Sequence, residues 1–286
     1  TGYRLRNYAL YIHTSDMISN KFHSSPGVST ADHIRSTGAP VVILGAILLL
    51  MLLFPAAMPA RDRPDPDTIL EKADLIRFPP GSYQVNVKVS TTLGDSDPEI
   101  RVYTVLSKGN SKSLVMTMAP AVDKGQVLLM RENSLWAFLP NVSQPVRLPL
   151  SQKLTGQVAN GDLARAKFHG DYAPKLQDTV IIEGKKYYLL ELTAKGRGTT
   201  YHRILYWVRS KNFRPYKAEF YSLSDRLMKT CYFSGFKSVK GTIRPTRLVM
   251  LDALKQDERS VLDYSGMEKR KLPDKVFTKD YLKKLF

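Results

Sequence analysis

Apolar and polar residues alternate one by one along much of this chain, in short runs that end at turn residues. The first such run, residues 83–89, reads YQVNVKV; others follow up to residue 139 and again between 180 and 265. A period of two puts alternate side chains on opposite faces of a strand, so each run predicts a strand with one apolar face. A sheet of about ten or more strands must curl or close. The sequence therefore predicts a mainly β fold (α+β class) with one large, curled antiparallel sheet.

One helix is predicted before the succession of strands and one after it. Asp65 can cap a helix that has Pro66 in its first turn. Apolar residues then recur at helical spacing until the sequence FPPG, residues 78–81, ends the element. Residues 278–286 are predicted to form a closing helix.

An uncharged apolar run, VVILGAILLLMLLF at residues 41–54, precedes the predicted sheet and is followed by PAAMPA. This layout is typical of a secretory signal peptide, although with PAAMPA included the run is long enough for an uncleaved anchor. We expect a disordered or overcalled extension at 1–40, a signal peptide with its cleavage region or an anchor at 41–60, and a single domain at 61–286. This domain would lie outside the cytoplasm.

The chain is strongly basic, with a net charge of +17 at pH 7, and the excess persists after residue 60. A basic body suits an anionic partner such as a membrane surface, an acidic protein or nucleic acid. Export away from the cytoplasm argues against nucleic acid. A lysine-rich solvated surface without a partner is the alternative.

Residues that could carry catalysis or bind a metal are scarce. After the leader the histidines are His169 and His202, and the one cysteine is Cys231. These residues lack the spacing of a metal site, and no nucleophile elbow or phosphate-binding glycine motif is present. We therefore predict a protein that is not an enzyme and needs no metal or cofactor. The alternative is a hydrolase with His169 as base, Asp171 as its partner and Ser151 as nucleophile.

Large apolar side chains are abundant, and a curled sheet of this size can enclose an apolar ligand. Methionine suits variable acyl chains because its side chain is soft and flexible. The candidate cavity residues are Met116, Met118, Met130, Trp136, Phe138, Leu163, Phe168, Tyr206, Tyr221 and Phe233.

One segment, SQKLTGQVANGDLARAKFHGDY at residues 151–172, breaks the succession of strands. Asn160 or Asp162 can cap a single helical turn, and Leu163 and Phe168 can point back to the apolar face. We predict a lid or plug near the mouth of the cavity. Its candidate residues, beside these two apolar ones, are Leu154, Asn160, Asp162, Arg165, Asp171 and Tyr172.

Several long stretches, from about Pro66 to Phe286, resemble one family. They include DPDTILEKAD, LLMRENSLWAFLPNVSQPVRLPLSQKLTGQ, NGDLAR, GDY, YYLLELTAK, RPYKAEFYSLSDRLMKTCYF and RPTRLVMLDAL. In these the chain is similar to the outer-membrane lipoprotein-sorting protein family, a LolA-like group of bacterial envelope proteins.

This resemblance implies an incomplete antiparallel β-barrel wrapped over a few short helices. It implies a monomeric periplasmic carrier that binds the acyl chains of lipoproteins or phospholipids and moves them toward the outer membrane. Such a carrier would touch membrane surfaces transiently and could meet an inner-membrane transporter. The alternative function is a non-catalytic docking or accessory subunit of such a transporter, with the cavity filled by the protein's own side chains.

Overall fold

A computed structural model describes residues 64–283 except 141 and 256. The extension predicted at 1–40 and the leader predicted at 41–60 lie outside the described residues. Within the described part, no helix is long and apolar enough to cross a bilayer.

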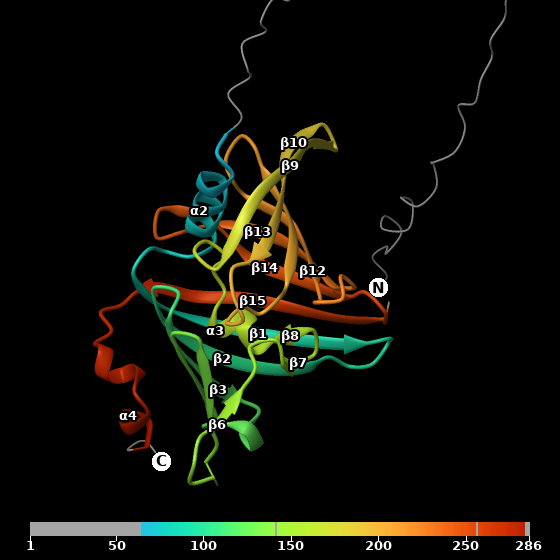
Figure 1. Cartoon of the computed structure of the whole chain (residues 1–286). Coiled ribbons are helices and arrows are strands. Elements are labelled where there is room, and N and C mark those ends of the chain that lie inside the picture. Colours follow the sequence, from blue (N-terminus) through green and yellow to red (C-terminus); the bar gives the residue numbers. More distant parts are fainter. Residues whose placement is uncertain (1–63, 141, 256, 284–286) are drawn as a thin grey trace, which may run out of the picture. The chain divides into compact units, whose positions relative to one another are not determined.

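Thirteen strands form one antiparallel sheet made of two meanders (Figure 1). The first meander contains β1 (Ser82–Leu93), β2 (Glu99–Lys108), β3 (Lys112–Ala119), β4 (Val127–Arg131), β5 (Ser134–Phe138) and β6 (Val146–Leu148). The second contains β9 (Tyr172–Ile182), β10 (Lys185–Ala194), β11 (Arg203–Arg209), β12 (Pro215–Tyr221), β13 (Leu227–Val239), β14 (Thr242–Asp252) and β15 (Glu258–Lys269). The meanders join where β1 pairs with β15, so β6 and β9 form the two edges.

The sheet curves without closing, because its edge strands β6 and β9 do not pair with each other. One source of curvature is a bulge in the β1–β15 pairing, where the register shifts between Gln84 and Asn86. Gly266 lies at this bulge with φ of 59°, a conformation that glycine adopts without strain. The predicted fold, a large curled antiparallel sheet with few short helices, is confirmed.

The remaining elements are short and lie in four places. Helix α2 (Pro66–Arg77) precedes the sheet and packs against β9, β12 and β14. Between β6 and β9 lie β7 (Lys153–Thr155), β8 (Val158–Ala159) and α3 (Asn160–Ala164); after β15 come the 3-10 turn η2 (Asp274–Phe277) and α4 (Lys279–Lys283). A further 3-10 turn, η1 (Ala121–Asp123), connects β3 to β4.

Helix α2 forms as the sequence predicts. The Asp65 carboxylate accepts hydrogen bonds from the Thr68 amide at 2.9 Å and the Thr68 hydroxyl at 2.7 Å. These two bonds hold the pKa of Asp65 below its usual value. Ile69, Leu70 and Ala73 are fully buried against the sheet. The cap and the apolar stripe together explain why this segment is helical.

Both faces of the sheet are apolar at one end. On β4, Leu128 and Met130 belong to the large cluster on the inner face, whereas Val127 and Leu129 belong to a second cluster. This second cluster lies on the outer face, because side chains of a strand alternate between faces. Residues 270–283, here named the strap, cover it. In Figure 1 the strap, red, lies beside β2 and β3.

Candidate functional site

Residues 151–172, here named the crossing segment, run from one edge of the sheet to the other. They follow β6, contain β7, β8 and α3, and lead into β9. Since β6 and β9 are the two edge strands, the chain must cross the opening between them. Val158, Leu163 and Phe168 of this segment are buried in the inner-face cluster. The crossing segment therefore occupies the space that an open, curved sheet would leave free.

Several groups of polar contacts hold the crossing segment, and the first joins it to β13. The Asp162 carboxylate accepts hydrogen bonds from the Lys229 ammonium at 2.6 Å, the Tyr201 hydroxyl at 2.7 Å and the Ala159 amide at 2.8 Å. The Asp162 and Lys229 side chains are 8% and 5% exposed. Burial, with the nearby Asp162 charge, raises the pKa of Tyr201 well above its usual value. This hydroxyl therefore stays a donor at neutral pH.

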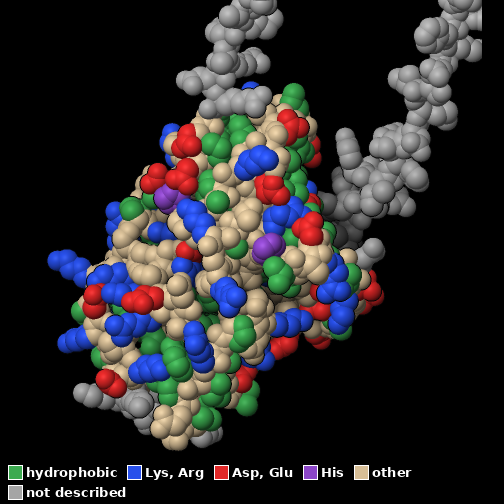
Figure 2. Space-filling model, in the orientation of Figure 1, with side chains coloured by type: hydrophobic (Ala, Val, Ile, Leu, Met, Phe, Trp, Pro, Cys, Tyr) green, Lys and Arg blue, Asp and Glu red, His purple; other side chains and the backbone are tan. Residues whose placement is uncertain are grey.

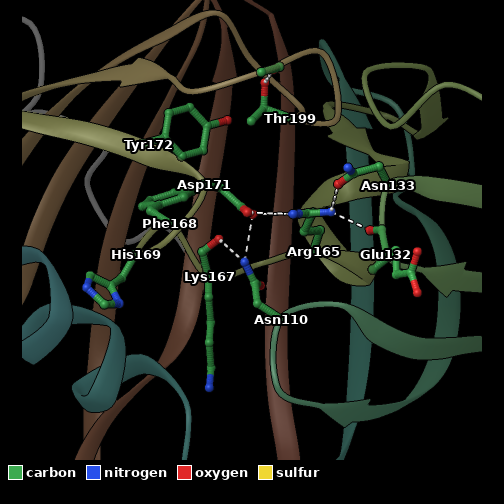
Figure 3. Close-up of polar contacts among 12 residues, drawn as sticks. Asn110, Glu132, Asn133, Arg165, Lys167, Phe168, His169, Asp171, Tyr172 and Thr199 are labelled. Carbon is green, nitrogen blue, oxygen red and sulfur yellow. Dashed lines mark hydrogen bonds and ion pairs between the residues drawn. The ribbon is translucent and has the colours of Figure 1, made fainter.

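The second group joins the segment to the first meander (Figure 3). The Arg165 guanidinium forms two hydrogen bonds of 2.5 Å to the Asp171 carboxylate. Arg165 also donates to the Glu132 carbonyl and to Asn133 in the β4–β5 turn. Asn110, in the β2–β3 turn, donates to Asp171 at 2.6 Å. A bidentate arginine–carboxylate pair of this kind fixes orientation as well as position.

The third group joins the segment to α2. The Asp74 carboxylate accepts hydrogen bonds of 2.7 Å from the Phe168 and His169 amides. It also pairs with Arg77 at 3.3 Å, and both side chains are buried. Burial raises the pKa of Asp74 above its usual range, against the opposing effect of Arg77. The His169 ring nitrogen Nε2 lies 3.0 Å from the Asp67 carboxylate.

Phe168 places an aromatic ring at the centre of the inner face. Its ring makes edge contacts with Tyr172, Tyr206 and Phe220, at centroid distances of 5.8, 5.5 and 6.3 Å. The Arg77 guanidinium lies 4.5 Å from the centroid of the same ring. Edge-to-face rings and a stacked cation each stabilise such a cluster beyond the area that they bury. The inner face is thus filled here by the crossing segment itself.

Gly161 shows how closely the segment packs. A Cβ atom at this position would lie 1.9 Å from the Thr200 hydroxyl oxygen. We expect Gly161→Ala to lower the free energy of unfolding by about 1–3 kcal/mol, because an overpacked site must shift its neighbours. Gly196→Ala is the matched control, since a Cβ there meets no atom within 4 Å. Urea unfolding of both variants measures the difference; equal midpoints would contradict tight packing at Gly161.

The structure divides the predicted cavity residues between different environments. Five of them lie in the inner-face cluster: Met130, Leu163, Phe168, Tyr206 and Phe233. Met116, Trp136 and Phe138 lie in the outer-face cluster beneath the strap, Met118 is 43% exposed, and Tyr221 is half-buried. The prediction of one common cavity therefore needs correction for these last five. On their strands these five residues alternate with inward-facing residues, so their side chains point to the outer face. The prediction placed them inside because it took the outer face to be polar.

The remaining predicted residues of the crossing segment all take part in its packing or its polar contacts. Leu154 packs against the inner-face cluster, and the Asn160 side-chain nitrogen Nδ2 donates to the Pro149 carbonyl at 3.1 Å. The Tyr172 hydroxyl accepts from the Tyr201 amide and donates to its carbonyl, both at 3.2 Å. The hydrolase hypothesis required His169 to pair with Asp171. The structure instead pairs His169 with Asp67 and Asp171 with Arg165.

Asp74, Arg77 and Lys229 are central to the site and were not predicted from the sequence. The sequence does indicate that Lys229 is buried. It stands two and four residues before Cys231 and Phe233 on β13, so its side chain lies on the same inward face. Arg77 likewise follows Ala73 by four residues, on the buried stripe of α2. A charge in phase with a buried stripe indicates a buried ion pair.

The hollow described beside the inner face is small. Beside Arg77, Phe78 and Tyr264 there is a hollow of only about 10 Å³. Larger hollows of about 520, 370 and 230 Å³ are open grooves, each lined by part of residues 149–157. Side chains of the crossing segment, among them Phe168, fill part of the inner face instead.

An incomplete antiparallel barrel whose inner face is covered by short helices and a crossing segment defines the LolA-like class of folds. The crystal structure of a LolA superfamily protein from Nitrosomonas europaea is 56% identical to this chain, with a TM-score of 0.73. The match covers 76% of this chain and 98% of that one. The chain therefore belongs to the LolA superfamily, which confirms the resemblance found in the sequence.

More distant structures share the fold. A DUF1329 family protein from Desulfovibrio piger is 22% identical, covering 76% of this chain and 99% of that one with a TM-score of 0.64. A putative outer membrane lipoprotein-sorting protein domain from Vibrio parahaemolyticus is 18% identical, covering 76% and 97% with a TM-score of 0.65. A family model described as "Uncharacterized protein" matches residues 109–284. No curated protein matches the chain.

Proposed function

We propose that this protein is a cell-envelope carrier that binds acyl chains of lipids or lipoproteins on the inner face of its sheet. Its membership of the LolA superfamily supports a carrier, and the lipoprotein-sorting domain from Vibrio parahaemolyticus shares its fold. The observation that carries the proposal is the crossing segment, which covers an aromatic inner face and is held there by polar contacts of residues 159–171. The predicted leader would place the protein in the periplasm, or tether it to the inner membrane if uncleaved.

The crossing segment acts as a plug in this proposal. An acyl chain that replaces Phe168 gains about 0.8 kcal/mol for each methylene group taken from water. When the plug moves, the contacts of Phe168 are lost and the Asp162–Lys229 and Arg165–Asp171 pairs are strained. The free energy gained by burying the acyl chain must offset these losses. Return of the plug then favours release into a membrane. Binding and release make and break no covalent bond, so the carrier needs no catalytic residue.

A basic surface supports transient contact with a membrane. Lys269, Arg270, Lys271 and Lys275 are exposed around the start of the strap. Figure 2 shows many Lys and Arg side chains, blue, on the side where the strap lies in Figure 1. Each basic side chain near an anionic membrane adds about 1 kcal/mol of attraction. We propose that the monomeric carrier docks on anionic membranes in this way.

A docking or accessory subunit of an inner-membrane transporter is the second candidate. The hollow of about 10 Å³ beside Arg77 favours it, because a self-filled inner face needs no ligand to be stable. The two functions differ in one respect. A carrier must bind lipid when the plug moves, whereas a docking subunit keeps its inner face filled.

Lipid binding by the purified full-length protein separates the two candidates. We expect native mass spectrometry of protein isolated from a bacterial envelope to show bound lipid, and a fluorescent fatty acid to compete with it. Phe168→Ala removes the ring that the acyl chain must displace, so it should raise the affinity for the fatty acid about tenfold or more, whereas Leu254→Ala at an exposed site should leave it unchanged. Protein that carries no lipid and binds no fatty acid would reject the carrier and favour the docking subunit.

A further inference from the structure

A groove of about 370 Å³ lies where the two halves of the open sheet approach each other. One wall comes from the β4–β5 turn and the chain around β6, and the other from the connection between β10 and β11. These walls are in close contact, since a Cβ atom on Gly198 would lie 2.7 Å from Asn133 Oδ1. The groove therefore marks the seam of the incomplete barrel.

Two arginines face this seam groove from opposite walls. Arg147 lies on β6 and Arg197 in the β10–β11 connection, and both side chains are exposed. Arg147 donates to the Ser134 hydroxyl at 3.2 Å, and neither arginine forms an ion pair with another described residue. Arg165 and Lys229 differ in this respect, because both are paired with carboxylates.

The lining of the seam groove contains no carboxylate. The groove of about 520 Å³ differs, because Asp97, Glu99 and Glu258 line it, and the groove of about 230 Å³ includes Asp252. Guanidinium groups without an acidic partner suit a phosphate, whose oxygens match their paired donors. The seam groove is thus the described groove best fitted to an anion.

The floor of the seam groove is apolar and continues into the inner face. Leu135 and Leu150 line the groove and also belong to the inner-face cluster, against which Leu148 packs. Asn133, on the same wall, accepts a hydrogen bond from Arg165 of the crossing segment. A ligand in this groove would therefore touch both the apolar interior and a residue that holds the plug.

We infer that the seam groove binds the phosphate of an anionic lipid headgroup between Arg147 and Arg197, with the acyl chains directed over Leu135 and Leu150 toward the inner face. This inference rests on the proposed carrier function and names its ligand class. A zwitterionic lipid such as phosphatidylcholine offers the same phosphate, but it also brings its own cation next to the two arginines. The site therefore selects phosphatidylglycerol-like lipids over phosphatidylcholine.

The test compares two variants of the full chain that lose the same charge. Arg147→Gln/Arg197→Gln removes both groove arginines, and Lys237→Gln/Arg259→Gln removes two exposed basic residues of the second meander. Each protein is mixed with vesicles of phosphatidylcholine, or of phosphatidylcholine and phosphatidylglycerol, and native mass spectrometry measures the lipid taken up. We expect the groove variant to lose the preference for phosphatidylglycerol by about tenfold or more, and the control to keep it.

Competition with inorganic phosphate distinguishes a lipid site from a site for free phosphate. We expect phosphate at millimolar concentration to leave phosphatidylglycerol uptake intact, because the acyl chains contribute most of the binding. Equal uptake of both lipids by the wild type, or an undiminished preference in the groove variant, would overturn the headgroup site and leave the carrier standing. Failure of the wild type to take up either lipid would instead overturn the carrier function itself.

Discussion

Asp162→Ala is expected to lower the free energy of unfolding by about 3–5 kcal/mol, because it leaves the Lys229 ammonium buried without its carboxylate. Lys229 is 5% exposed, and its contact with Asp162 is 2.6 Å. The change also removes the acceptor of the Tyr201 hydroxyl and of the Ala159 amide. Urea unfolding followed by circular dichroism measures the loss.

A double variant separates the ion pair from the other contacts of Asp162. Asp162→Ala/Lys229→Met replaces both charges with apolar groups, and part of the lost stability should return because no charge remains buried. Asp263→Ala is the matched control on the outer face, where Asp263 and its partner Arg247 are 30% and 55% exposed. That variant should lose about 1 kcal/mol or less. Equal losses for Asp162→Ala and Asp263→Ala would show that the buried pair does not hold the crossing segment.

The alternation of residues was sufficient to predict the sheet. Tyr83, Val85, Val87 and Val89 are all buried, as their period of two requires. The prediction failed where one strand is apolar on both sides, since periodicity does not say what covers the second face. Met116 and Trp136 pack there because the strap reaches them from the far end of the chain. Contacts of this kind depend on tertiary structure alone.

The position of the crossing segment was predictable, but its partners were not. The break in the pattern at residues 151–172 marks a chain that leaves one edge of the sheet and enters the other. Asp162 pairs with Lys229, 67 residues later, and Asp74 binds amides more than ninety residues away. No local pattern links such residues. The phase of Lys229 on its strand indicates burial, and burial requires a partner without naming it.

The strap gives the second large effect, through Phe277. This side chain is 1% exposed and lies in the outer-face cluster with Leu272 and Leu282. Phe277→Ala is expected to lower the free energy of unfolding by about 3–5 kcal/mol, since truncating a buried phenylalanine loses apolar contact and leaves a cavity. A loss below about 1 kcal/mol would mean that the strap is only loosely attached.

The same variant tests whether the strap is independent of the inner face. Lys108 and Lys112 bind Asp274 at 2.6 and 3.0 Å, and these contacts hold the pKa of Asp274 below its usual value. Phe277→Ala should increase amide hydrogen exchange in residues 272–282 while fatty-acid binding by the folded protein stays unchanged, because the sheet separates the two clusters. Leu254→Ala, at a side chain 68% exposed, is the control and should alter neither. If Phe277→Ala changes the affinity for the fatty acid as much as Phe168→Ala does, the two faces are coupled and the ligand does not act on the inner face alone.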